Sequence, residues 1–248
     1  MSDRPILFSP SMVRALIGGR KTQTRRLLNP QPPEWCAQDK PGFSCLTPRG
    51  YVEFRGHYPG EHHIEAGYGS KFVKLPVLKG DRLYVREVYF QRGHWAPVAG
   101  ESTKGGRQKW AFVPADELIL FDAPETFRTG IDGADPAAVA WHKRLARFMP
   151  RRVSRLTLIV ENVRVERLQS ISEGDAEAEG VVWDSADGFD VWYVPGPPYL
   201  PHTATAAECY RGLWASLHDA EGQRWEDNPF VVATTFRVVP GNIDRVKI

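Results

Sequence analysis

One short segment gathers the side chains that are best suited to chemistry. It combines a lysine, two threonines and three arginines, in the order Gly19-Arg20-Lys21-Thr22-Gln23-Thr24-Arg25-Arg26. The arginines alone suit phosphate binding, because a guanidinium group donates paired hydrogen bonds to an oxyanion. A lysine amine that is desolvated beside other cations loses proton affinity and can deprotonate a hydroxyl nucleophile. Lys21 and Thr24 would face opposite ways on a regular strand, so this partnership requires a bend or a helical turn.

A second feature is the acidic stretch Ser172–Gly180, which has four carboxylates and no basic residue. Ser172 predicts a helix N-cap, and Glu173 and Asp175 suit the first turn, where the helix dipole favours negative charge. Glu179 lies in the last turn, where a carboxylate is disfavoured by up to about 1 kcal/mol. Two interpretations of Glu179 stay open: a solvated carboxylate, or a functional one that a basic group offsets.

Other candidate sites are less specific. Glu87 falls on the apolar face of a predicted strand, Arg82–Phe90, and is interpreted either as a strand-edge residue or as a carboxylate at a barrel mouth. Cys36 and Cys45 lack zinc-site spacing relative to the downstream histidines, so neither a metal nor another cofactor is predicted. Those histidines are His57, His62 and His63. The chain has no P-loop, GxGxxG, GxSxG, HExxH or zinc-deaminase motif, which removes those chemistries as leading ideas.

The elements that must position these residues are mostly strands. Helices are expected after Ser9 or Ser11 and at Ser172–Val181 and Thr205–Leu217; the first has Met12, Val13, Leu16 and Ile17 on one face and ends at Gly18-Gly19. The expected extended segments are Ile6–Phe8, Arg20–Leu28, Arg82–Phe90, Val153–Leu168 and Phe230–Val239. Val153–Leu168 suits one bent strand or a hairpin. No βαβ repeat is visible, so the sequence predicts an α+β protein built on a small mixed or antiparallel β-barrel.

Three stretches interrupt this pattern, at about residues 29–79, 91–148 and 183–204. Proline and glycine cluster at Asn29–Pro48, Tyr58–Gly80 and Val194–Pro201, which are interpreted as long loops. Gln91–Phe148 has three tryptophans in polar sequence and is interpreted as a loop-rich insertion, anchored to the core or walling a ligand. The chain is therefore treated as one domain, residues 1–248, with insertions.

Composition limits the class of protein. The 248 residues are 42% hydrophobic and 25% charged, without a secretory signal or an apolar run long enough to cross a membrane. Three irregularly spaced cysteines suit a reducing compartment, so a cytoplasmic protein without a membrane partner is expected. The net charge is only +2, yet Arg4–Pro33 and Lys143–Arg155 each hold six basic residues and no acid. The oligomeric state stays open.

Several of these segments, in their order along the chain, resemble a known family. The opening strand, the helix and Gly19–Arg26 resemble the start of ASCH-domain proteins. The later segments resemble the longer ASCH proteins that phages and prophages often carry: Gly80–Glu87, Arg155–Leu158, Arg167–Ser172 with Ala176–Gly180, and Asn228–Val231. The resemblance covers roughly half of the chain and implies a PUA-like β-barrel, a fold associated with RNA and modified bases.

The resemblance also implies an activity. Small ASCH proteins similar in these motifs are N4-acetylcytidine amidohydrolases with a Lys/Thr/Glu triad. Lys21 matches the proton acceptor, Thr24 the nucleophile and Glu179 the proton donor of that triad. The remaining residues of the expected ligand site are Arg20, Thr22, Arg25, Arg26, Arg86 and Glu87. The expected partner is a nucleoside or modified base.

Two other functions stay open. One is a non-catalytic module that binds RNA or a modified base, with Arg25, Arg26 and the basic run Arg144–Arg155 contacting phosphates. The other is a metal-independent ribonuclease. Phosphate contacts predict a binding affinity that falls steeply with salt.

Overall fold

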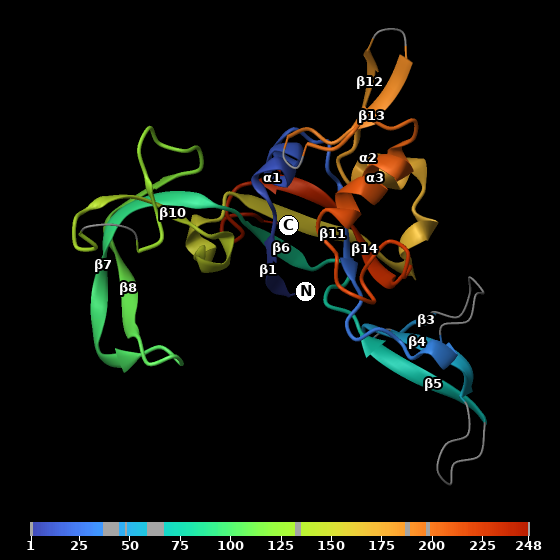
Figure 1. Ribbon diagram of the computed structural model, residues 1–248. Coiled ribbons are helices and arrows are strands. Elements are labelled where there is room, and N and C mark those ends of the chain that lie inside the picture. Colours follow the sequence, from blue (N-terminus) through green and yellow to red (C-terminus); the bar gives the residue numbers. More distant parts are fainter. Residues whose placement is uncertain are drawn as a thin grey trace. The chain divides into compact units, whose positions relative to one another are not determined.

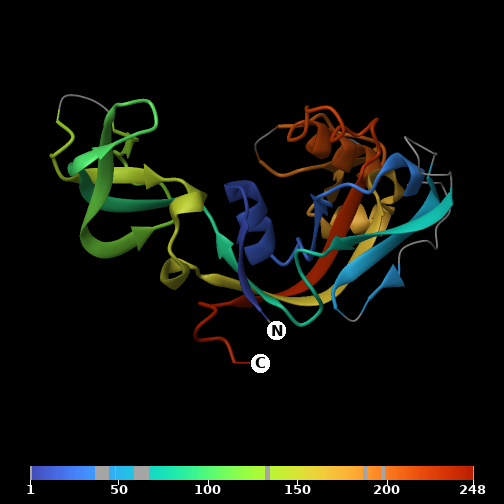
Figure 2. The ribbon, with the colours of Figure 1, turned by 90° about the horizontal axis from the view of Figure 1, so that it is seen from below.

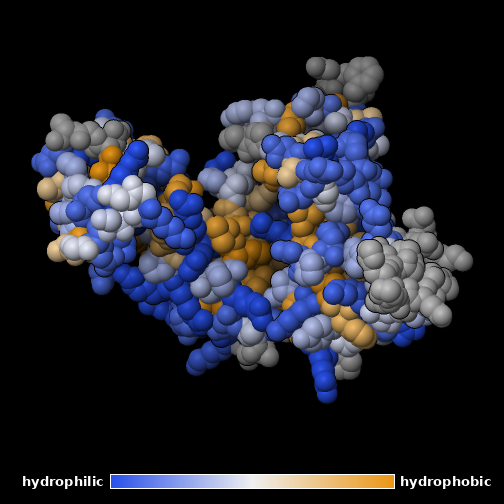
Figure 3. Space-filling model, turned by 60° about the horizontal axis from the view of Figure 1, so that its bottom comes forward, coloured by the Kyte–Doolittle hydropathy of each residue, from blue (hydrophilic) through white to orange (hydrophobic). Residues whose placement is uncertain are grey.

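The computed structural model describes residues 2–36, 45–47, 49–58, 67–131, 135–186, 189–196 and 199–247. Within these residues the chain forms a strand-rich α+β fold with fourteen strands and three α-helices (Figure 1). The predicted α+β class is therefore confirmed. Hydrophilic side chains cover most of the face seen in Figure 3. Within the described part of the chain, every helix is too short or too polar to cross a membrane.

The largest sheet has five strands, in the order β1-β6-β11-β14-β2. Their bounds are β1 Asp3–Leu7, β6 Arg82–Arg86, β11 Leu156–Arg167, β14 Phe230–Pro240 and β2 Gln23–Leu27. Figure 2 shows β11 and β14 as long neighbouring strands. As paired, the sheet is open, with β1 and β2 at its edges. The stretch Val153–Leu168 forms one strand rather than a hairpin, and its first five strand residues are all buried because both faces of the strand are covered.

The chain divides into two compact units. Unit 1 comprises Met1–Arg4, Arg14–Leu83 and Leu158–Val239, and unit 2 comprises Pro5–Val13, Tyr84–Thr157 and Pro240–Ile248. The insertion boundaries expected from the sequence stay a prediction.

Unit 1 holds two smaller sheets besides its share of the large one. The three-stranded sheet β3-β4-β5 and the two-stranded sheet β12-β13 are antiparallel. Their bounds are β3 Cys45–Leu46, β4 Tyr51–Tyr58, β5 Gly67–Lys74, β12 Val182–Ala186 and β13 Phe189–Tyr193. Gly56 on β4 passes close to the short 3-10 helix η1 (Glu34–Cys36), and Phe54 packs edge-on against Phe230 with ring centroids 4.9 Å apart. The interpretation of Tyr58–Gly80 as a loop is therefore wrong, because it contains β5.

Unit 2 is built on the four-stranded sheet β8-β7-β10-β9. Its strands are β7 Tyr89–Ser102, β8 Gln108–Leu120, β9 Arg128–Thr129 and β10 Ala140–Arg144, followed by the 3-10 helices η2 (Ala146–Phe148) and η3 (Arg151–Val153). The expectation of a loop-rich Gln91–Phe148 is wrong. Much of the β7–β8 hairpin is exposed on both faces, so its sequence lacks the apolar alternation that marks a half-buried strand.

Two predicted elements differ in detail. The expected strand Arg82–Phe90 ends at Arg86 and a new one starts at Tyr89. In the break, the Glu87 amide donates to the Met149 sulfur at 3.2 Å instead of to a strand partner. Helix α1 (Pro10–Ile17) begins near Ser9 as expected, but Ile17 is 54% exposed and Ala15 is buried in its place. A helix face is about 100° wide, so adjacent positions at its edge are hard to assign.

Candidate functional site

Lys21 is positioned by a reversal of the chain after α1. Gly19 has a φ of +71°, which glycine adopts without strain, and the amides of Arg20 and Lys21 both donate to the Ala15 carbonyl, at 2.9 and 3.1 Å. The Thr22 amide then donates to the Ala178 carbonyl at 2.8 Å. The chain before β2 is thereby tied both to α1 and to the end of α2 (Glu173–Ala178).

The acidic helix α2 begins at the predicted N-cap, Ser172, but ends at Ala178, three residues before the predicted end at Val181. The Ser172 hydroxyl accepts from the Asp175 amide at 3.1 Å, which is an N-cap. Glu173 accepts from the Ala206 amide at 2.7 Å and so supports the start of α3 (Ala206–Ala215). Glu179 caps the C-terminal end of α2, and Gly180 follows with a φ of +104°.

Lys21 and Glu179 form a buried pair. The Lys21 Nζ lies 2.6 Å from Glu179 Oε2 and also donates to the Glu179 carbonyl oxygen at 2.8 Å. Their side chains are 0% and 4% exposed. Among the described residues, Glu179 Oε1 has no hydrogen-bond partner, and Arg25 Nη1 lies 3.9 Å from it. Glu179 is therefore not a solvated carboxylate, and a cation offsets it.

Burial decides the electrostatics of this pair. Desolvation lowers the pKa of Lys21; Glu179 opposes that effect, and the charges of Arg26 and Arg25 add to it. A lowered pKa enlarges the fraction of Lys21 that is a neutral amine, which is the form that acts as a base.

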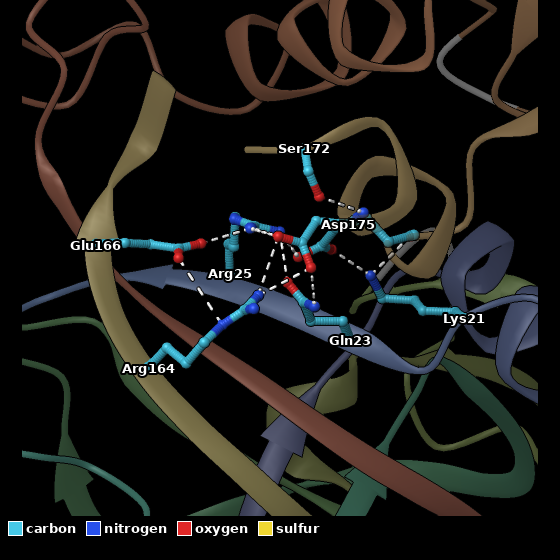
Figure 4. A network of polar contacts seen from close by, with 8 residues as sticks. Lys21, Gln23, Arg25, Arg164, Glu166, Ser172 and Asp175 are labelled. Carbon is cyan, nitrogen blue, oxygen red and sulfur yellow. Dashed lines mark hydrogen bonds and ion pairs between the residues drawn. The ribbon is translucent and has the colours of Figure 1, made fainter. Parts of the chain in front are cut away.

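Arg25 is enclosed by polar groups of the protein itself. Its guanidinium group donates to Gln23 Oε1 and to Glu166 Oε1, and to Asp175 Oδ2 at 2.9 Å (Figure 4). Burial acts to lower the pKa of Arg25, but Glu179 and Glu166 outweigh it and the pKa is raised. Arg25 therefore stays charged and holds β2, β11 and α2 together.

Asp175 is the centre of this network. Besides Arg25, it accepts from Gln23 Nε2 at 2.8 Å and from Arg164 Nη2 at 2.8 Å. Burial acts to raise the pKa of Asp175, but the hydrogen bonds from Gln23, Arg164 and Arg25 lower it well below its usual range. The ionised carboxylate is thus strongly favoured in the folded protein.

Thr24 lies on the other face of β2. Gln23 and Arg25 point toward α2, and successive side chains of a strand alternate, so the pleat directs Thr24 away from them. Thr24 is buried and is directly paired with Thr234 of β14. Lys21 precedes the first residue of β2, so strand alternation does not fix its direction relative to Thr24. The structure brings Lys21 and Glu179 together, and Thr24 is three residues from Lys21 in the sequence.

The remaining predicted ligand residues are divided between the units. Arg20, Thr22 and Arg26 are exposed in unit 1. In unit 2, Arg86 donates to the Arg147 carbonyl at 3.3 Å, and buried Glu87 accepts two hydrogen bonds of 2.9 Å from Arg155. Glu87 is thus held in a bidentate ion pair.

Three residues of the network were not expected from the sequence. Arg164 and Glu166 are two apart on β11, and charges at alternating positions late in an apolar strand were the available signal. Tyr210 is buried on α3, and both burial and the Glu179 carboxylate raise its pKa well above the usual value. Nothing in the pattern of α3 distinguishes Tyr210 from an ordinary core aromatic.

No metal centre is found among the described residues, since no three His, Cys, Asp or Glu side chains are placed to hold an ion. Cys36 is buried, with its sulfur 3.8 Å from the Phe54 carbonyl oxygen. His62, His63 and the side chains of Cys45 and His57 lie outside the described residues. Comparison with protein-family models, with curated proteins and with solved structures found no match to this chain.

Proposed function

We propose that the protein is an amidohydrolase that removes an acyl group from N4-acetylcytidine or a related modified nucleoside. The observation that carries the proposal is the fully buried Lys21–Glu179 contact of 2.6 Å, in which Glu179 keeps one oxygen without a hydrogen bond among the described residues. Buried ionisable pairs are costly, so they favour a functional interpretation over a stabilising one. A PUA-like fold is part of the proposal, and the α+β fold with its antiparallel β2–β14 pairing supports it.

The proposed reaction starts with Lys21 as a neutral amine and Glu179 as a carboxylic acid. Lys21 takes the proton of the Thr24 hydroxyl as its oxygen attacks the acyl carbon. The C–N bond then breaks, Glu179 protonates the departing nitrogen, and the acyl group stays on Thr24 as an ester. The proton on Lys21 then returns to Glu179, and the neutral amine takes a proton from water as the water oxygen attacks the ester. The bond between the acyl carbon and the Thr24 oxygen breaks, and Lys21 returns its proton to that oxygen. The products are the free amine of the base and a carboxylic acid, and the pair regains its proton balance.

Incubation with N4-acetylcytidine tests this proposal, with cytidine release followed by chromatography. The wild type should release cytidine. Lys21→Ala and Thr24→Ala should lower the rate by at least about 100-fold, because each removes a group that transfers a proton or attacks the substrate. Thr24→Ser should keep part of the activity. Lys79→Ala, which removes an exposed lysine of the same unit, is the matched control.

A folding control is needed because Lys21→Ala leaves Glu179 buried without its cation. The double variant Lys21→Met/Glu179→Leu removes both charges and fills the space with apolar groups, a change that is often neutral for stability. It should melt within a few degrees of the wild type and be inactive. A stable double variant that still releases cytidine would disprove the assigned roles. A wild type that is folded but inactive would disprove the substrate.

A further inference from the structure

The basic run of unit 2 has more positively charged side chains than carboxylate partners among the described residues. Lys143–Arg155 holds six basic residues and no acid. Two of the six are paired with carboxylates: Arg151 with Asp244, and Arg155 with Glu87. The other four are Lys143, Arg144, Arg147 and Arg152. Of these, Arg144 is half-buried and lies over the Phe112 ring at 4.1 Å, whereas the other three are exposed.

An exposed aromatic ring lies beside two of these cations, Arg144 and Arg147. Phe148 is 54% exposed, and Leu145 beside it is also exposed. The guanidinium carbons of Arg147 and Arg144 lie 4.9 and 5.7 Å from the centre of the Phe148 ring. We call Lys143, Arg147, Phe148 and Arg152 the arginine–phenylalanine surface. An exposed ring beside cations matches a base and its flanking phosphates.

The backbone under this surface is held firmly. Met149 is fully buried, and the Tyr89 hydroxyl and Arg86 donate to the carbonyls of Phe148 and Arg147, both at 3.3 Å. Turns at η2 and η3 fix the flanking residues. The exposed side chains therefore project from a fixed frame, and little backbone entropy is lost when a ligand binds.

We propose that the arginine–phenylalanine surface binds single-stranded nucleic acid, with a base stacked on Phe148 and phosphates contacted by Arg147, Arg152 and Lys143. Charge complementarity favours a polyanion, and the exposed ring favours one with aromatic bases. A membrane surface suits it less, because only Phe148 and Leu145 offer exposed apolar side chains in the run. This inference is independent of the amidohydrolase proposal, because it rests on unit 2 alone.

Fluorescence anisotropy with a labelled single-stranded 12-nucleotide oligouridine, titrated with the full chain at several salt concentrations, tests the inference. The wild type should bind at low salt, with an affinity that falls as salt rises. Arg147→Ala/Arg152→Ala should reduce the slope of log affinity against log salt by about 1.4, which corresponds to two phosphate contacts on a single strand. Phe148→Ala should weaken binding about tenfold at every salt concentration and leave the slope unchanged.

The matched control is Lys104→Ala/Arg107→Ala, which removes two exposed basic residues of the same unit. It should bind like the wild type. Equal losses in the control and in Arg147→Ala/Arg152→Ala would overturn the proposal, since binding would then depend on net charge alone. No binding by the wild type, or binding to anionic phosphatidylserine vesicles but not to the oligonucleotide, would also overturn it. Melting curves show whether each variant is folded.

Discussion

At the residue scale, the chemistry that we propose depends on the burial of Lys21 and Glu179. Desolvation lowers the pKa of Lys21 in spite of the adjacent carboxylate. The same pair on a surface would be a solvated ion pair worth less than about 1 kcal/mol and without basic character. The chemistry that we propose therefore follows from burial as much as from residue identity.

Asp175 gives this site a measurable pH dependence. Its pKa is lower in the folded protein than the value of about 3.9 for a free side chain. A lowered carboxylate pKa stabilises the folded state above the free value, and this contribution is lost as the pH falls through the free value toward the folded one. We expect the free energy of unfolding of the wild type to fall steeply below about pH 4.5.

Asp175→Asn should lower the free energy of unfolding by about 3 kcal/mol at pH 7, because it leaves buried Arg25 short of a carboxylate. It should also make the free energy of unfolding fall less steeply at acidic pH. Urea unfolding between pH 3 and 7 measures both effects. Asp219→Asn, an exposed carboxylate of the same unit, should change neither. If the free energy of unfolding fell as steeply at acidic pH in Asp175→Asn as in the wild type, Asp175 would not be the source of this pH dependence.

At the element scale, the spacing of the carboxylates along α2 is similar to the spacing of their partners along β2. Asp175 and Glu179 are four residues apart on α2, a rise of about 6 Å. Gln23 and Arg25 are two residues apart on β2, a distance of about 6.7 Å along the strand, and Lys21 lies just before the strand begins. The two carboxylates can therefore meet the side chains of β2 and of the residues before it in order, Glu179 with Lys21 and Asp175 with Gln23 and Arg25.

The close approach of β4 to η1 predicts a strong effect at Gly56. A Cβ at this position would lie 1.8 Å from the Trp35 carbonyl oxygen, which is backbone and cannot move aside as a side-chain tip can. Gly56→Ala should therefore destabilise the protein by about 3 kcal/mol. Gly105→Ala, where a Cβ meets nothing within 4 Å, is the control. Thermal unfolding of both variants measures the difference, and equal melting temperatures would contradict this packing.

At the scale of the whole molecule, the polar network and the arginine–phenylalanine surface belong to different units. The partners described above for Lys21, Arg25 and Asp175, namely Glu179, Glu166, Gln23 and Arg164, lie in unit 1. The basic run lies in unit 2 with its partners Asp244 and Glu87. The two activities that we propose can therefore be changed separately by substitution.

Truncation of the β7–β8 hairpin tests whether this part of unit 2 takes part in the proposed turnover. Pro97 and Trp110 are paired across the hairpin, and the residues between them are almost all exposed. Replacing Pro97–Trp110 with an Asn-Gly turn joins Ala96 to Ala111, which are themselves paired. Cytidine release should stay within about twofold of the wild type, since truncation removes no group of the network. A loss of activity in a variant that is still folded would show that the hairpin takes part in turnover.

How much was predictable differs between the parts of the chain. Helix α2 was predicted from its Ser172 cap and its acidic first turn, and helix α3 from its inward face of Cys209, Leu213 and Trp214. The α+β class and strand β14 were also predicted. The strands of unit 2 were interpreted as loops, because an exposed hairpin leaves no apolar alternation in its sequence. The break between β6 and β7 could not be predicted either, since it depends on Met149, which is distant in the sequence.

The sequence by itself determined which residues were candidates. They were Lys21 before β2, Glu179 at the C-terminal end of α2, where the helix dipole disfavours a carboxylate, and the basic run Lys143–Arg155. Only the tertiary structure decided that Lys21 and Glu179, 158 residues apart, meet in a site without solvent. It also decided that Arg25 is enclosed by carboxylates, while Phe148 lies exposed between arginines. Local patterns fix the identity and spacing of side chains, whereas burial and long-range pairing depend on how the whole chain packs.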